Sequence, residues 1–158
     1  MLFLPEYVGG ISSNGKLYTP PSELEKKHLF LQEFKEFCKY KSVWTLIGSI
    51  AVKLDNNKIV NRGFIINPDG EIVSKYDKIH MFDISINGEE HYESSTLEPG
   101  NKAVLVNTQF ATIGHTDCYD VRFPTLYREL AKAGAEILVF PAAFTKTTGC
   151  AHWPILNR

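Results

Sequence analysis

Cysteine is scarce in this sequence and long apolar runs are absent, which narrows the class of protein. Three cysteines in 158 residues are an odd number and too few for a disulfide framework, so a reducing compartment is expected. Neither the cysteines nor the histidines show the spacing of a zinc site, and we predict no metal. No apolar stretch reaches the roughly 20 residues that a membrane-spanning helix needs. These absences predict a cytoplasmic protein without a membrane partner.

An excess of charge of one sign is absent as well. Seventeen basic residues stand against eighteen acidic ones, for a net charge of −1, so no strong field draws the protein to nucleic acid. There is no glycine-rich phosphate loop, and Met1–Glu6 lacks the basic and apolar regions of a secretory signal. We therefore expect the partner to be a small molecule or a second copy of the chain.

The sequence does contain alternating strand and helix patterns, on a length that suits one domain. Ser22 and Glu25 form a capping-box pattern, which predicts a helix that runs to about Tyr40. A second helix is predicted from Pro124 to Gly134, since proline suits a first turn and glycine a C-cap. Apolar runs predict strands at residues 2–4, 43–52, 59–66, 72–73, 103–106, 110–114 and 136–140, with a turn at 67–70. This order favours an α/β layered fold.

Cys118 is the residue whose position most suggests chemistry. It follows the predicted strand at 110–114 and precedes the helix at Pro124, where free backbone amides and the helix dipole stabilise a thiolate or an oxyanion. Asp117 acts against this, because a nearby negative charge disfavours a thiolate. Free cysteine is also among the most buried residue types, so a purely structural role stays open.

Lys78 and Glu6 carry no signal of their own. Each follows a predicted strand, and lysine and glutamate at strand ends are usually solvated. The residues taken one by one therefore yield a candidate nucleophile and no catalytic partners for it.

Several segments, taken in chain order, resemble one family. They are Leu4–Glu6, Tyr76–Asp83, Glu93–Gly100, Cys118–Pro124, Gly134–Leu138, Pro141–Thr145 and Thr148–Trp153. Together they are similar to the nitrilase superfamily of carbon–nitrogen hydrolases, in the branch of omega-amidases and deaminated-glutathione amidases. The match follows the family's order along essentially the whole chain. It therefore outweighs the interpretation of Lys78 and Glu6 as solvated side chains at strand ends.

The resemblance implies an α/β/β/α four-layer sandwich, with residues 1–158 as a single partial carbon–nitrogen hydrolase domain. Family members begin before Met1 and continue past Arg158, so the fold is expected to be incomplete at both termini. Members of the family usually pair two subunits. A homodimer, or another homo-oligomer, is therefore expected.

The resemblance also implies a Glu-Lys-Cys triad made of Glu6, Lys78 and Cys118. Glu6 would be the general base, Cys118 would form a thioester, and Lys78 with the backbone N–H of Tyr119 would hold the oxyanion. Lys78 would also lower the pKa of the thiol. The expected reaction splits a small carboxamide into ammonia and a carboxylate without a cofactor. Residues expected to orient substrate or catalytic groups are Glu93, Tyr119, Arg122 and Phe144.

Two positions depart from the family pattern, and two other functions stay open. Asp117 stands where this branch usually has an apolar residue, and Pro154 where it usually has an acidic one. The first alternative is an inactive, truncated remnant of an amidase, and the second is a binding or assembly module. Ammonia release from alpha-ketoglutaramate or deaminated glutathione would separate the amidase from both.

Overall fold

The computed structural model describes residues 1–8, 10, 22–86 and 89–143, and they form two larger sheets with a helix outside each, and a separate two-stranded sheet. In the first sheet β3 (Thr45–Lys53), β4 (Ile59–Ile66) and β5 (Ile72–Asp77) are antiparallel neighbours. Two short strands, β1 (Leu2–Phe3) and β2 (Glu23–Leu24), pair in parallel with β3. In the second sheet β9 (Thr112–His115) lies between β8 (Val104–Asn107) and β10 (Ile137–Val139).

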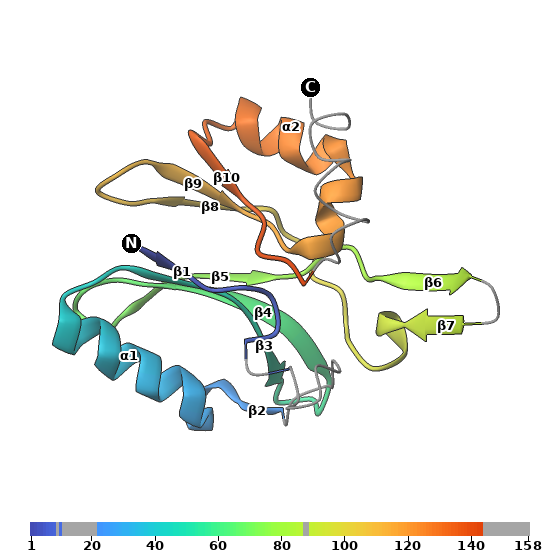
Figure 1. Cartoon of the computed structure of the whole chain (residues 1–158), viewed down its shortest axis with the longest axis horizontal. Helices are drawn as coiled ribbons and strands as arrows, with labels where there is room; N and C mark the ends of the chain where they lie inside the picture. Colours follow the sequence, from blue (N-terminus) through green and yellow to red (C-terminus); the bar gives the residue numbers. More distant parts are fainter. Residues whose placement is uncertain (9, 11–21, 87–88, 144–158) are drawn as a thin grey trace.

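The helices α1 (Leu29–Lys41) and α2 (Pro124–Lys132) cover the outer faces, which gives the order α1, first sheet, second sheet, α2 (Figure 1). This is the α/β/β/α layering that the resemblance implied. β3 and β4 are almost wholly buried, as the nearly continuous apolar runs predicted. β1 is different, because Leu2 and Phe3 are exposed where a buried strand was expected.

The alternation of side chains along a strand builds one core on each face of the first sheet. Ile47 and Phe64 face α1, where they pack with Leu31. Their chain neighbours Leu46 and Ile65 belong to the other core, between the sheets, which also contains Val106 and Ile113 from the second sheet. β3 and β4 are therefore the shared wall of both cores.

The predicted helix start at Ser22 and Glu25 is wrong. Glu25 lies in a short 3₁₀ turn, η1 (Glu25–Lys27), and α1 begins only at Leu29. The Glu25 carboxylate accepts hydrogen bonds from Arg62 on β4 (2.9 Å) and Lys75 on β5, so it is not available as a helix cap. Glu23 serves instead, accepting a hydrogen bond from the Leu29 amide at 3.2 Å.

Two further strands, β6 (Asp83–Ile86) and β7 (Glu89–Tyr92), form a hairpin that projects from the end of the sandwich (Figure 1). Two 3₁₀ turns complete the fold: η2 (Glu93–Ser95) follows β7, and η3 (Cys118–Arg122) joins β9 to α2. The described residues contain no helix that is long and apolar enough to cross a membrane.

Candidate active site

Lys78 is buried between two carboxylates. Only 2% of it is exposed, and its Nζ lies 2.8 Å from Oε1 of Glu6 and 2.9 Å from Oε2 of Glu93. Both acids are themselves at least nine-tenths buried. An ammonium group in such a place is tolerated only when it is paired and hydrogen-bonded, and here both conditions hold.

Glu6 reaches this cluster because the chain after β1 comes very close to β3. A side chain on Gly48 would collide with the Pro5 carbonyl, so glycine is required at this point of β3. Asn61 donates a hydrogen bond to Oε1 of Glu6 at 3.3 Å, and the Ala143 amide donates to Oε2 at 3.2 Å. The carboxylate is therefore held from β4 and from the segment after β10.

A second glycine positions Lys78, which lies just after β5. The Gly100 amide donates to the Lys78 carbonyl at 2.8 Å, and a side chain on Gly100 would collide with the Asp77 carbonyl. The Lys78 amide donates in turn to the Asn61 carbonyl at 2.9 Å. Backbone contacts on both sides thus fix the direction in which the lysine leaves its strand.

Glu93 is held by donors from three parts of the chain. The Tyr7 hydroxyl donates to Oε1 at 2.8 Å, and the Phe82 amide donates to Oε2 at 2.7 Å. Asn61 also lies within 3.4 Å of Oε1. Glu93 thus contacts Lys78 directly, and its expected role in orienting substrate or catalytic groups stays a prediction.

Cys118 opens η3 with φ of 41°, a left-handed value that is strained for a residue with a side chain. Its amide donates to the Pro141 carbonyl at 2.8 Å, which ties the turn to the end of β10. The Glu6 carboxylate lies close enough to its thiol to act on the pKa of that thiol. Cys118 as a whole residue is partly exposed.

Lys78 does act to lower the pKa of the Cys118 thiol, as expected, but other influences outweigh it. Burial raises this pKa, repulsion from Glu6 adds to the rise, and the attraction of Lys78 is too small to reverse it. For Lys78 itself, burial acts to lower the pKa, but attraction to Glu6 and the other nearby acids outweighs it, so the pKa is raised. The resting site therefore holds a neutral thiol beside a charged lysine.

The other predicted residues have mixed outcomes. Tyr119 lies in η3, next to Cys118, with its ring 5.1 Å from that of Phe82 between centroids. Arg122 ends η3 and is half-buried. Phe144 lies outside the described residues.

Three contributors were missed by the sequence reasoning: Tyr7, Asn61 and the backbone amide of Phe82. Asn61 left a signal, since an amide side chain within the apolar run of 59–66 is unusual in a buried strand. Tyr7 left none that periodicity reveals, because it lies in a loop.

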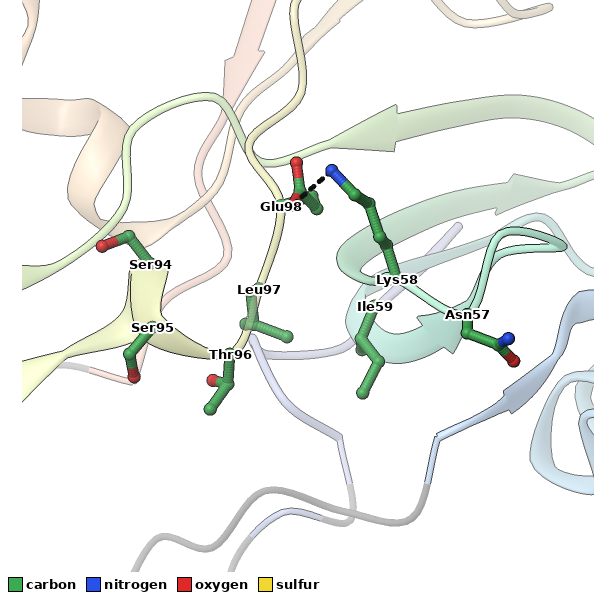
Figure 2. Close-up of a pocket in the computed structure, with 8 residues that line it drawn as sticks. All are labelled: Asn57, Lys58, Ile59, Ser94, Ser95, Thr96, Leu97 and Glu98. Carbon is green, nitrogen blue, oxygen red and sulfur yellow. Dashed lines mark ion pairs between the residues drawn. The ribbon is translucent and has the colours of Figure 1, made fainter.

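A surface pocket elsewhere on the molecule lacks comparable chemistry. Figure 2 shows its lining, which comes from Asn57–Ile59 and from Ser94–Glu98. Lys58 and Glu98 form an ion pair of 2.8 Å there, but both side chains are about half exposed, where such a pair contributes roughly 0–1 kcal/mol. The described residues also include no group of three side chains suited to a metal ion.

Comparison with known proteins gives the same family throughout. A family model for carbon-nitrogen hydrolases matches residues 1–158. The deaminated glutathione amidase of Yersinia enterocolitica is 37% identical over 150 residues, which are 92% of this chain and 52% of that protein. The omega-amidase NIT2 of Homo sapiens is 40% identical over 128 residues, 80% of this chain and 46% of that protein. The chain thus spans about half the length of these relatives.

Solved structures of related proteins share the fold. The NitFhit protein of C. elegans superposes with a TM-score of 0.79 at 30% identity, covering 98% of this chain and 38% of that one. Nit3 of Saccharomyces cerevisiae, a member of branch 10 of the nitrilase superfamily, gives 0.76 at 28% identity, covering 98% and 55%. These structures confirm the α/β sandwich, and with the family model matched from the first residue to the last, the chain belongs to the carbon–nitrogen hydrolase family.

Proposed function

We propose that this protein hydrolyses the C–N bond of a small linear carboxamide, with Glu6, Lys78 and Cys118 as its catalytic triad. Residues 1–158 act as one domain in this proposal. The observation that carries it is the buried lysine between two carboxylates, one of which also lies close to the thiol. A buried charged cluster costs stability and is kept where function requires it. Groups with strongly shifted pKa values gather at active sites for this reason.

In the first half of the reaction, Glu6 takes the proton of the Cys118 thiol as sulfur attacks the amide carbonyl carbon. The raised pKa of the thiol fits this order, because the proton leaves during the attack and not before it. Lys78 and the backbone N–H of Tyr119 stabilise the oxyanion. Glu6 then gives the proton to the departing nitrogen, the C–N bond breaks, and ammonia leaves a thioester on Cys118.

In the second half, water attacks the thioester while Glu6 takes one of its protons. The carbon–sulfur bond breaks, Glu6 returns that proton to the sulfur to restore the thiol, and the acid product loses water's second proton to solvent to become the carboxylate. Glu93 keeps Lys78 in place throughout, since it contacts Nζ through both oxygens at 3.2 and 2.9 Å. These steps use side chains, backbone and water alone.

The choice of substrate follows from the relatives. Proteins named omega-amidase and deaminated glutathione amidase are 37–40% identical to this chain. A short carboxamide that also carries a carboxylate is therefore the substrate class we propose. Arg122 and Phe144 are the residues that we assign to orienting it.

The test is ammonia release from alpha-ketoglutaramate and from deaminated glutathione. Cys118→Ala should abolish turnover. Lys78→Met and Glu6→Gln should each lower kcat by at least about 10², the scale for losing an oxyanion donor or a general base. Lys58→Met is the matched control, because Lys58 pairs with Glu98 in a half-exposed position away from the cluster.

Near-normal turnover in Lys78→Met or Glu6→Gln would overturn the assignment at that residue. A protein that shows a cooperative unfolding transition and releases no ammonia from either compound would instead support an inactive amidase remnant.

A further inference from the structure

Asp117 is a fully buried acid next to the candidate nucleophile. It is 1% exposed, and it precedes Cys118 directly at the start of η3. Its backbone is firmly held, since its amide donates to Oδ2 of Asp120 at 2.8 Å and the Asp120 amide donates to its carbonyl at 3.0 Å. Its side chain is not held in the same way. The Asp120 amide faces the Asp117 carboxylate in a capping-box arrangement, but neither carboxylate oxygen reaches hydrogen-bond geometry with a partner in the part of the chain that the structure describes.

The surroundings of this carboxyl group are predominantly acidic. The titratable groups that act on it, or that it acts on, are Glu6, Tyr7, Tyr76, Lys78, Cys118, Asp120 and Tyr127. Lys78 is the cation among them, and it already contacts Glu6 and Glu93 at 2.8 and 2.9 Å. An ionised Asp117 would therefore be a third carboxylate around one ammonium group.

Burial raises the pKa of the Asp117 carboxyl, and repulsion from Glu6 raises it further. Lys78 opposes this rise, and so does Ser49, whose hydroxyl falls short of hydrogen-bond geometry. A buried carboxylate without hydrogen bonds takes up a proton more readily than it stays charged. The unpaired oxygens and the raised pKa are therefore consistent with each other, because both reflect burial without a donor in hydrogen-bond geometry.

We propose that Asp117 is present as a neutral carboxylic acid in the working site, and that loss of its proton to solvent switches the Cys118 nucleophile off. This rests on the proposed role of Cys118. Asp117 acts through its neighbour and is a positioning residue, not a catalytic one. Ionisation of Asp117 adds one more negative charge to a site in which Lys78 already faces Glu6 and Glu93 and in which Asp120 also acts on Asp117. The added charge opposes both a thiolate and an oxyanion.

The experiment compares the wild-type protein with Asp117→Asn by the rate at which iodoacetamide modifies Cys118, followed by peptide mapping from pH 5.5 to 9.5. Asparagine has nearly the same shape and stays neutral. The two rates should agree within about twofold at the lowest pH. The variant should then become faster by about tenfold or more as Asp117 of the wild type ionises, because a charge within about 4–6 Å shifts a neighbouring pKa by roughly 1–3 units.

Two results would overturn the proposal. One is a ratio of the Asp117→Asn rate to the wild-type rate that stays near one at every pH, and the other is a raised ratio that does not change with pH. The second would mean that Asp117 is ionised throughout. Asp55→Asn, at an exposed turn residue, is the matched control and should leave the ratio near one. Asp117→Thr provides a second neutral variant if the asparagine fails to fold, and it should show the same rise with pH.

Thermal unfolding supplies a readout that does not involve Cys118. An acid whose pKa is raised by folding contributes stability that is present below its unfolded pKa of about 3.9 and is lost as pH rises through the folded value. The melting temperature of the wild type should therefore fall relative to that of Asp117→Asn as pH rises from 4. A wild-type melting temperature that instead rises relative to that of Asp117→Asn over this pH range would contradict a neutral buried acid. Because neither readout needs turnover, a failure to release ammonia would count against the proposed function and leave Asp117 to be judged by these measurements.

Discussion

At the scale of single residues, Glu93 shows how the site keeps its lysine in place. Its carboxylate accepts hydrogen bonds from Lys78, from the Tyr7 hydroxyl and from the Phe82 amide. Glutamine at this position would keep the shape but replace one acceptor oxygen with a donor. One of these donors would then lose its partner, and Lys78 would lose half of its countercharge.

We therefore expect Glu93→Gln to lower kcat by at least about tenfold with little change in KM, since displacing a catalytic group by about 1 Å can cost on the order of 10² in rate. Steady-state ammonia release measures both parameters. Glu98→Gln is the control, because Glu98 forms a half-exposed pair with Lys58, and it should stay within about twofold of the wild type. A Glu93→Gln protein with normal kcat would show that Lys78 does not depend on this carboxylate.

The sequence alone could predict only part of this site. Cys118 could be found from its place between a strand and a helix, but Lys78 and Glu6 could not, because residue type predicts exposure and both are buried. Their roles came from resemblance alone. The direction of the pKa shift of Cys118 could not be predicted from the sequence either, because it depends on how deeply the thiol is buried and on how near Glu6 lies.

At the scale of elements, Asp120 joins η3, the turn that contains Cys118, to β5 and the residues after it. The Tyr76 hydroxyl donates to Oδ2 at 2.6 Å, the His80 amide donates to Oδ1 at 3.0 Å, and the His80 ring lies 2.7 Å from Oδ1. The Asp117 amide also donates to Oδ2. Asp120 is fully buried, and its contacts with Tyr76 and with the Asp117 amide are buried too, whereas those with His80 are partly exposed.

Replacing Asp120 with asparagine should lower the free energy of unfolding by about 2–3 kcal/mol, because a buried donor left without an acceptor costs roughly 1–3 kcal/mol. Urea unfolding followed by circular dichroism measures this. The same substitution at Asp83, an exposed acid that accepts one hydrogen bond from the Ser94 amide at 3.0 Å, should cost less than about 1 kcal/mol. Equal effects at the two sites would mean that Asp120 does not connect η3 to β5.

Elements with strong local patterns could be predicted from the sequence. β4 was predicted at 59–66, where it lies, and the turn at 67–70 has Gly70 at φ 79°. Elements whose bounds depend on contacts between residues far apart in the sequence could not be predicted in this way. The start of α1 was misplaced because Glu25 pairs with Arg62 and Lys75. The β6–β7 hairpin was missed because Asp83–Ile86 alternates polar and apolar residues over four positions only, and Glu89–Tyr92 is almost wholly polar.

At the scale of the whole molecule, the layers bring distant parts of the chain to one place. Glu6 follows β1, Lys78 follows β5, Glu93 opens η2 and Cys118 opens η3, yet their side chains form one connected cluster. The cluster is assembled from residues of a chain that spans about half the length of its curated relatives. A homo-oligomer and a cytoplasmic location stay predictions.

The most direct test of the account is to capture the covalent intermediate on Cys118. The protein is mixed with alpha-ketoglutaramate, quenched in acid within its first turnovers, and digested for mass spectrometry. We predict that the peptide containing Cys118 gains the mass of the substrate less ammonia, and that Cys118→Ser yields no such thioester. Ammonia release without any adduct on that peptide, or with the adduct on Cys38 or Cys150, would contradict the assignment of Cys118 as the nucleophile.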